Sequence, residues 1–312
     1  MFEIPGAATA DPATAADIER LKRELNAVIL AHFYQEPAIQ DLADHVGDSL
    51  FLAQRAAETD AEVIVFAGVH FMAETAKILN PDKQVLVPDL EAGCSLADGC
   101  PADEFSAWLA QYPGHKVVSY INCAAATKAL SDVICTSSNA VKVVESFPKD
   151  QPIVFAPDRF LGRWVGEQTG RDLVLWHGSC EVHERFTASE LRSYRTTHPG
   201  IEIIAHPECP PDVLAEADYV GSTSGMIDWV QSRNPRQVVM VTECSMSDNV
   251  AAESPDTEFV RPCNLCPHMK RITLAGIRAS LENLEYPVTV EPASATEARR
   301  SIERMLAVGS GS

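Results

Sequence analysis

Ala27-Val28-Ile29-Leu30-Ala31-His32-Phe33-Tyr34 is a short apolar run that ends in polar and ring-bearing side chains. Its length and its β-branched residues are typical of a buried strand, and a helix-like segment, 17–25, precedes it. Similar apolar runs follow at 63–67, 85–87, 116–119, 153–156, 201–205 and 238–241. Short strands that alternate with helices predict βαβ units and parallel sheets. We therefore expect an α/β fold.

The polar end of this first run recurs twice at a nearly constant spacing. His32, Tyr120 and His206 stand 88 and 86 residues apart. Each unit then has a second polar residue (Tyr34, Asn122 and Glu208), a hydroxyl (Ser49, Ser137 and Thr223) and a closing cysteine (Cys94, Cys180 and Cys266). Such a period predicts three copies of one domain-sized unit. We place the copies at 14–94, 95–182 and 183–284, with the C-terminal segment 285–312 packing on the first copy.

These repeated residues are expected to meet in one place. In an α/β unit, the residues at the carboxyl ends of the parallel strands face one crevice. Three repeated three-layer αβα units in a pseudo-threefold arrangement would bring the polar strand ends, the hydroxyls and the cysteines to a central active site. Hydroxyls at helix N-termini are suited to holding carboxylate or phosphate groups.

The composition limits the partners of the protein. With 25 basic and 44 acidic residues, the net charge of -19 argues against nucleic acid or an anionic membrane as a partner. No apolar run has the length of a membrane span. Nine scattered cysteines do not resemble the disulfide framework of a small secreted protein. We therefore expect a cytoplasmic protein with reduced thiols, four of which lie in the core as small apolar side chains: Cys123, Cys135, Cys209 and Cys244.

The segment Cys263-Asn264-Leu265-Cys266-Pro267 carries two thiols close together. By itself, Cys-x-x-Cys fits a redox pair, half of a zinc site or chance, and Cys263 could form a disulfide with Cys266. Proline suits the first position of a helix, so we expect a helix to begin directly after Cys266.

Three well-separated cysteines, one from each repeat, favour one kind of metal site. Structural zinc normally takes four protein ligands, usually in close pairs. A [4Fe–4S] cluster commonly takes four cysteines, so a cluster held by three keeps one iron open. An open iron can act as a Lewis acid, which suits dehydration or carbonyl chemistry better than electron transfer.

Several segments in combination resemble quinolinate synthase, over about residues 25 to 285. They are Ala31-His32-Phe33-Tyr34-Gln35, Val46-Gly47-Asp48-Ser49-Leu50, Glu91-Ala92-Gly93-Cys94-Ser95-Leu96, Ser119-Tyr120-Ile121-Asn122, Cys135-Thr136-Ser137-Ser138-Asn139-Ala140, His206-Pro207-Glu208-Cys209 and the Cys263–Pro267 segment. The resemblance implies the pseudo-threefold fold and a [4Fe–4S] cluster on Cys94, Cys180 and Cys266. It also implies condensation of iminosuccinate (iminoaspartate) with dihydroxyacetone phosphate, which gives quinolinate, phosphate and water for NAD biosynthesis. Functional coupling to the enzyme that supplies iminosuccinate would follow.

The same resemblance implies roles for individual residues. It places the substrate contacts on His32, Ser49, Tyr120, Asn122, Ser137, His206, Glu208 and Thr223. Tyr34 falls where the family has a tyrosine implicated in proton transfer. We expect the hydroxyls, with Tyr120 and Asn122, to hold carboxylate and phosphate oxygens. We expect His32, His206, Tyr34 and Glu208 to move protons.

Two other classes of function stay open. Another open-cluster hydro-lyase would use the same thiols without a phosphate-bearing substrate, although the three hydroxyl turns favour one. A non-enzymatic iron–sulfur or zinc scaffold would need a fourth protein ligand. Dinucleotide binding is not expected, because no Gly-x-Gly-x-x-Gly follows the first strand. His183 follows Cys180 closely and could border the cluster.

Overall fold

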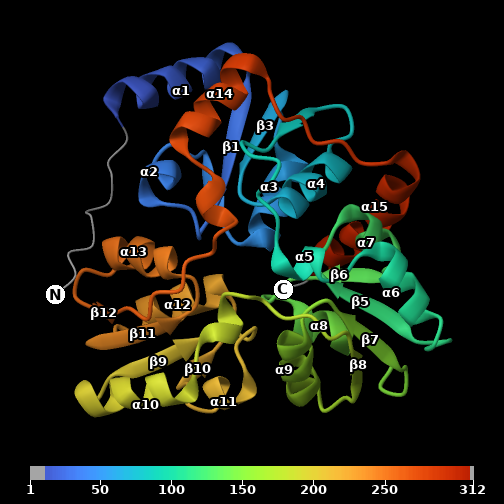
Figure 1. Ribbon diagram of the computed structural model, residues 1–312, viewed down its shortest axis with the longest axis vertical. Helices are drawn as coiled ribbons and strands as arrows, with labels where there is room; N and C mark the ends of the chain where they lie inside the picture. The colour runs from blue at the N-terminus through green and yellow to red at the C-terminus, as the bar shows by residue number, and fades with distance from the viewer. Residues whose placement is uncertain (1–10, 310–312) are drawn as a thin grey trace. The chain divides into compact units, whose positions relative to one another are not determined.

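The computed structural model describes residues 11–309, so the last three residues of the predicted C-terminal segment lie outside it. It contains three four-stranded sheets whose strands all pair in parallel, with the orders β2-β1-β3-β4, β6-β5-β7-β8 and β10-β9-β11-β12 (Figure 1). Because each sheet has the same order of strands, the prediction of an α/β protein with three repeated units is confirmed. Their placement around one central site stays a prediction.

The strands and helices follow the repeat closely. The strands are β1 (Ala27–His32), β2 (His45–Gly47), β3 (Val63–Ala67), β4 (Gln84–Leu86), β5 (Lys116–Tyr120), β6 (Val133–Cys135), β7 (Ile153–Ala156), β8 (Leu173–Leu175), β9 (Glu202–Ala205), β10 (Tyr219–Val220), β11 (Gln237–Val241) and β12 (Glu258–Val260). The inner strands are almost wholly buried, as expected when helices cover both faces of a parallel sheet.

Helices occupy the segments between these strands. They are α1 (Pro12–Glu24), α2 (Pro37–Gln40), α3 (Ser49–Glu58), α4 (His70–Leu79), α5 (Ser95–Asp98), α6 (Ala102–Leu109), α7 (Ala125–Ala129), α8 (Ala140–Glu145), α9 (Arg159–Thr169), α10 (Ala188–Thr197), α11 (Pro211–Leu214), α12 (Thr223–Arg233), α13 (Cys244–Glu253), α14 (Leu274–Asn283) and α15 (Pro292–Gly309). Two short 3-10 turns, His183–Arg185 and Met269–Arg271, precede α10 and α14.

An aspartate fixes the register of the first two strands in every sheet. Its carboxylate accepts a hydrogen bond from a backbone N–H of the first strand, 2.8 Å away in each copy, and pairs with a basic side chain. The three sets are Asp44 with Ile29 and Lys22, Asp132 with Val117 and Lys116, and Asp218 with Ile203 and Arg195. A charged acceptor on a backbone donor is stronger than a neutral pair. The same aspartate contact therefore occurs once in each of the three sheets.

Removing one of these carboxylates should destabilise its sheet. Asp132→Ala leaves the N–H of Val117 without its acceptor and removes the partner of Lys116. We expect the free energy of unfolding to fall by about 1.5–3 kcal/mol, the usual contribution of a hydrogen bond to a charged group. Urea denaturation followed by circular dichroism measures the change, with Asp150→Ala at an exposed position as the control. Equal stabilities of the two variants would show that the aspartate does not hold the register.

A second repeated contact positions the loop before each of the three predicted cluster cysteines. The first residue of the helix after the second inner strand donates its backbone N–H to a carbonyl two residues before the cysteine. The pairs are His70 with Ala92 at 2.7 Å, Arg159 with Gly178 at 2.9 Å, and Cys244 with Asn264 at 3.1 Å. The loops that carry Cys94, Cys180 and Cys266 are thus tied to their own sheets in one common way.

The helix expected directly after Cys266 begins later than predicted. Met269–Arg271 forms a 3-10 turn, and α14 starts only at Leu274, where Oγ1 of Thr273 accepts from the N–H of Gly276 at 3.0 Å. Thr187 caps α10 at the matching place after Cys180. The prediction was wrong because the threonine side chain supplies a stronger start signal than Pro267 does.

The pairing of Cys244 differs from the expectation. Cys244 begins α13 and forms a disulfide with Cys263, with the two Cα atoms 4.9 Å apart. It was expected to be a free thiol in the core, and Cys263 was considered as a partner of Cys266. Because the backbone of Cys244 already bonds to Asn264, its side chain lies beside Cys263, and Cys266 stays a free thiol.

The described chain forms two compact units. The first contains residues 11–93 and 266–289, and the second contains residues 94–265 and 290–309. In the first unit α14, which lies in the range predicted as the third repeat, packs beside α1 and against β3 (Figure 1). Pro287 pairs with Leu86 at the edge of the same sheet.

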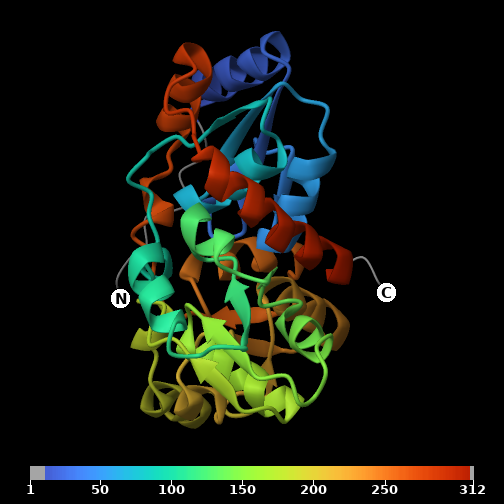
Figure 2. The same cartoon turned by 90° about the vertical axis from the view of Figure 1, so that its right-hand side faces the viewer.

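The second unit contains the other two sheets and α15. This helix packs against α7 and β6, and Figure 2 shows it along its length in red. Oγ of Ser301 donates to the carbonyl of Lys128 at 3.0 Å, which fixes the contact. The predicted C-terminal segment is thus shared between the two units. None of the described helices is both long and apolar enough to cross a membrane.

Candidate functional site

The predicted site residues are distributed over both compact units. His32, Tyr34, Ser49 and Cys266 belong to the first unit. The second unit contains Cys94, Tyr120, Asn122, Ser137, Cys180, His206, Glu208 and Thr223. The second unit therefore carries most of the candidate site.

In the first unit, the end of β1 orients a buried histidine. The backbone N–H of Tyr34 donates to Nδ1 of His32 at 3.1 Å, and the two rings meet edge to face with centroids 4.5 Å apart. The same turn recurs after β9, where the N–H of Glu208 donates to Nδ1 of His206 at 3.4 Å. Both histidines are therefore held through Nδ1, as expected of equivalent residues in a repeat.

In the second unit, His206 links the third sheet to the second. Its Nε2 lies 3.1 Å from Oγ of Ser137, which precedes α8. The ring is buried, with 2% of its surface exposed. Two of the residues predicted as substrate contacts thus meet across two repeats of the chain.

Glu208 is the centre of a buried polar cluster. Its Oε2 lies 2.7 Å from Nδ1 of His183 and 3.5 Å from Nδ1 of His206, and Tyr120 donates a hydrogen bond to its carboxylate. Burial acts to raise the pKa of Glu208, but the two imidazoles and the phenol outweigh it and lower the pKa to about 2. The carboxylate is therefore ionised at neutral pH.

Asp158 is a second buried carboxyl group near Glu208, and the sequence did not reveal it. It follows β7 and caps α9, where its Oδ1 accepts from the N–H of Leu161 at 2.7 Å. Burial, and then the charge of Glu208, raise the pKa of Asp158 well above its ordinary value. Neighbouring carboxyl groups whose pKa values are driven apart are a mark of acid–base sites. The period could have found it, because Glu243 caps α13 in the equivalent place.

His183 and Thr242 also join the cluster. Nε2 of His183 lies 3.0 Å from Oγ1 of Thr242, and its Nδ1 lies 3.2 Å from Sγ of Cys180 as well as close to Glu208. His183 was expected only to border the predicted cluster. Thr242 follows β11 and had no local sequence signal, since its partner stands 59 positions away.

The cysteines divide by accessibility. Of the free thiols in the described chain, those partly exposed are Cys94, Cys180 and Cys266, and those buried are Cys100, Cys123, Cys135 and Cys209. Cys94 and Cys180 are also neighbours in the second unit: the N–H of Glu181 donates to Oγ of Ser95 at 3.1 Å. Burial, then Glu208, then Cys94 raise the pKa of the Cys180 thiol. A metal ion or cluster would remove that proton and offset the crowded negative charge.

Two of the predicted hydroxyl residues begin their helices without capping them. Ser49 and Thr223 are the first residues of α3 and α12, but the caps are Asp48 and Ser222, whose side chains accept from Phe51 and Gly225. The hydroxyls of Ser49 and Thr223 are therefore not needed to cap the helix. This arrangement is compatible with the predicted binding of anionic groups.

Three buried oxygens near the ends of β5, β7 and β9 have no hydrogen-bond partner among the described residues. They are Oδ1 of Asn122, Oδ2 of Asp158 and Oε1 of Glu208. Buried polar atoms are normally satisfied, so a group of orphaned oxygens points to a ligand or water.

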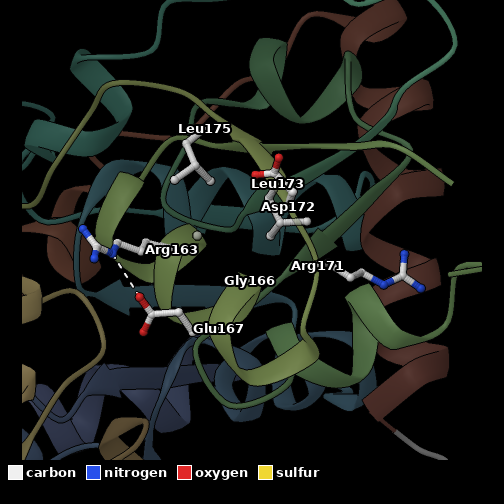
Figure 3. Close-up of a pocket in the computed structure, with 8 residues that line it drawn as sticks. Arg163, Gly166, Glu167, Arg171, Asp172, Leu173 and Leu175 are labelled. Carbon is white, nitrogen blue, oxygen red and sulfur yellow. Dashed lines mark hydrogen bonds and ion pairs between the residues drawn. The ribbon is translucent and has the colours of Figure 1, made fainter. Parts of the chain in front are cut away.

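A separate pocket of about 380 Å³ lies beside α9 and β8 (Figure 3). Arg163 and Glu167, which line it, form an ion pair at 3.0 Å. None of the predicted site residues lines this pocket, so it does not belong to the cluster around Glu208.

The family model and the similar proteins agree on one family for this chain. The model of the quinolinate synthetase A protein family matches residues 16–307. Quinolinate synthase 2 of Mesorhizobium japonicum is 56% identical over 301 residues, which cover 95% of this chain and 93% of that protein. Quinolinate synthase of Xylella fastidiosa (strain 9a5c) is 55% identical over 94% of this chain and 87% of that protein. Quinolinate synthase of Gloeothece citriformis is 55% identical over 93% of this chain and 92% of that protein. The chain therefore belongs to the quinolinate synthetase A family.

Proposed function

We propose that this protein is a quinolinate synthase of NAD biosynthesis, which condenses iminosuccinate with dihydroxyacetone phosphate to give quinolinate, phosphate and water. One observation carries the proposal beyond family membership. An ionised Glu208 lies among His206, His183 and Tyr120, close to the free thiol of Cys180. Such a cluster offers both proton-transfer groups and a metal ligand in one buried place.

The thiols fit the proposed cofactor. We propose that Cys94, Cys180 and Cys266 hold a [4Fe–4S] cluster, since these are the partly exposed free cysteines of the described chain and two of them are neighbours. When bound, such a cluster supplies an iron with an open coordination position that acts as a Lewis acid. The orphaned oxygens of Asn122, Asp158 and Glu208 support a site built for further groups.

The chain's own residues have distinct proposed tasks. Ser137, held by Nε2 of His206, and Asn122 would hold carboxylate or phosphate oxygens in the second unit. Ser49 and Thr223 would do the same from the first turns of their helices. Glu208 is ionised and would accept a proton, and the raised pKa of the neighbouring Asp158 means that the two carboxyl groups differ in their affinity for a proton.

His32 and Tyr34 complete the proposed proton-transfer set from the first unit. Nδ1 of His32 is engaged by the backbone of Tyr34, so the ring has a fixed orientation. Edge-to-face contact with His32 also limits the movement of the Tyr34 ring. We propose that both act on the substrate in the isomerisation and imine-forming steps. Because free imines hydrolyse in water, functional coupling to the cytoplasmic enzyme that supplies iminosuccinate is part of the proposal.

The proposal is tested by direct measurement of quinolinate. Protein purified without oxygen is mixed with freshly generated iminosuccinate and dihydroxyacetone phosphate, and quinolinate is quantified by liquid chromatography and mass spectrometry. We expect quinolinate and inorganic phosphate in equal amounts. Dihydroxyacetone without its phosphate should give none, because it lacks the leaving group. Dehydration of hydroxy acids without quinolinate formation would favour the rival hydro-lyase function instead.

A further inference from the structure

Three different metal-binding atoms meet in the second unit. Sγ of Cys180, a ring nitrogen of His183 and a carboxylate oxygen of Glu208 all lie within 4.8 Å of one another. Nδ1 of His183 is 3.2 Å from the sulfur and 2.7 Å from Oε2 of Glu208. His183 and Glu208 are almost fully buried, and Cys180 is half-buried.

The spacing of these atoms is close to that of a tetrahedral zinc site. Zinc bonds of about 2.0–2.3 Å to nitrogen, oxygen and sulfur put neighbouring ligand atoms roughly 3.4–3.6 Å apart. Side-chain movements of less than about 1 Å would therefore open the two contacts of Nδ1 of His183, at 2.7 and 3.2 Å, to that spacing. In the metal-free chain, Nδ1 of His183 and Oε2 of Glu208 contact each other directly at 2.7 Å, where the ion would lie between them.

The surroundings orient the histidine as a ligand. Oγ1 of Thr242 lies 3.0 Å from Nε2 of His183 and can accept its N–H, which leaves the lone pair on Nδ1 for a metal. Metal-bound histidines usually have such a partner on the other ring nitrogen. Oε1 of Glu208, buried and without a hydrogen-bond partner among residues 11–309, could accept a hydrogen bond from water in the fourth position.

We propose that the cluster-free protein binds one divalent transition-metal ion of the zinc class at Cys180, His183 and Glu208. Sulfur and imidazole donors select zinc over magnesium or calcium, which prefer oxygen ligands. On binding, the metal–sulfur bond forms as the Cys180 thiol loses its proton to solvent. His183 binds the ion through the lone pair of Nδ1 as the neutral tautomer that carries its N–H on Nε2, and any proton displaced from Nδ1 passes to solvent.

This site would compete with the proposed cluster. Cys180 cannot serve both a mononuclear zinc ion and the [4Fe–4S] cluster, and the ion also occupies Glu208. That consequence rests on the proposed function, whereas the metal site itself rests on the described geometry. Zinc bound here would hold the chain in a form that cannot take up the cluster.

The test uses the full-length, metal-free protein without oxygen. Titration with Co²⁺ should give one equivalent bound, with a thiolate charge-transfer band and the visible bands of tetrahedral cobalt, and Zn²⁺ should displace it. Competition with a chromophoric chelator then gives the zinc affinity. We expect His183→Ala and Glu208→Gln each to lower that affinity at least about 10-fold. Thr242→Val should lower it about 10–100-fold, because His183 loses the hydrogen bond that orients its ring.

Cys94→Ser is the matched control, because it removes a proposed cluster ligand but no member of the mononuclear site. It should keep the cobalt spectrum and the zinc affinity. Loss of binding in Cys94→Ser or Cys266→Ser would place the ion on the three thiols and overturn the proposal. So would unchanged affinity in both His183→Ala and Glu208→Gln, each checked for native circular dichroism. Quinolinate formation is not a readout here, so failure of this site is distinct from failure of the proposed function.

Discussion

Cys180→Ser should lose the iron–sulfur cluster and, with it, quinolinate formation. Anaerobically purified wild-type protein is expected to contain about four iron and four sulfide per chain with a broad visible absorbance, as a [4Fe–4S] cluster does. A hydroxyl is a poor ligand for such a cluster, and two thiols cannot replace three. We expect the variant to fall below about one iron per chain and its activity to drop to background. Iron and sulfide analysis, the visible spectrum and the quinolinate assay measure these effects together.

Cys209→Ala is the matched control for this experiment. Cys209 is a free thiol that is fully buried, with its sulfur 3.6 Å from the carbonyl of Val241. Its loss should leave the iron content and the spectrum unchanged. If Cys180→Ser kept its iron, or if wild-type protein held tightly bound zinc and no iron after anaerobic purification, the proposed cofactor would be wrong.

Glu208→Gln should lower kcat strongly. The amide keeps the size of the side chain but can neither carry the charge that faces His183 and His206 nor accept a proton. General acid–base groups contribute about 10²–10⁴-fold to rates, so we expect kcat to fall by about that factor. Glu104→Gln, at an exposed position in α6, should keep wild-type kinetics. A glutamine variant with more than half of the wild-type kcat would exclude Glu208 from proton transfer.

The pH dependence of this effect has a definite sign. The pKa of Glu208 is lowered to about 2, so the side chain stays ionised down to strongly acidic solution. A lowered pKa contributes stability that is present above the unfolded value, about 4.3, and is lost as the pH falls toward 2. Between pH 5 and 9 the activity of Glu208→Gln should therefore be low at every pH, and the acid limb of the wild-type profile should belong to another group.

The repeat made much of the fold predictable. The periodic placement of His32, Tyr120 and His206 indicates three similar units with parallel sheets, because each polar residue ends or follows a buried strand. The aspartate that bonds to the first strand of each sheet was not predicted, although Asp44, Asp132 and Asp218 have the same period as the other repeated residues. An aspartate between two apolar runs is also common in ordinary turns, so its bond to a distant strand has no local signal.

The site was only partly predictable for a similar reason. Glu208 and His206 follow one strand and share the period, so the sequence predicts them together. His183 contacts Thr242 and Glu208, and neither contact is visible in sequence because it depends on how distant segments of the third repeat fold together. The disulfide between Cys244 and Cys263 was missed because a 19-residue separation permits many other pairings. The start of α14 was misplaced because two start signals, Pro267 and Thr273, stand six positions apart.

The return of α14 to the first sheet has a consequence for synthesis on the ribosome. The first unit needs residues 266–289, and these leave the ribosome only after the 172 residues from 94 to 265 have been made. At about 5–20 residues per second, that interval lasts roughly 9–34 s. Until then, the apolar surface that Ile277 and Leu281 of α14 will cover is open on the nascent chain. Chaperones that bind apolar segments would therefore find the first unit, made earliest, among the last parts of the protein to finish folding.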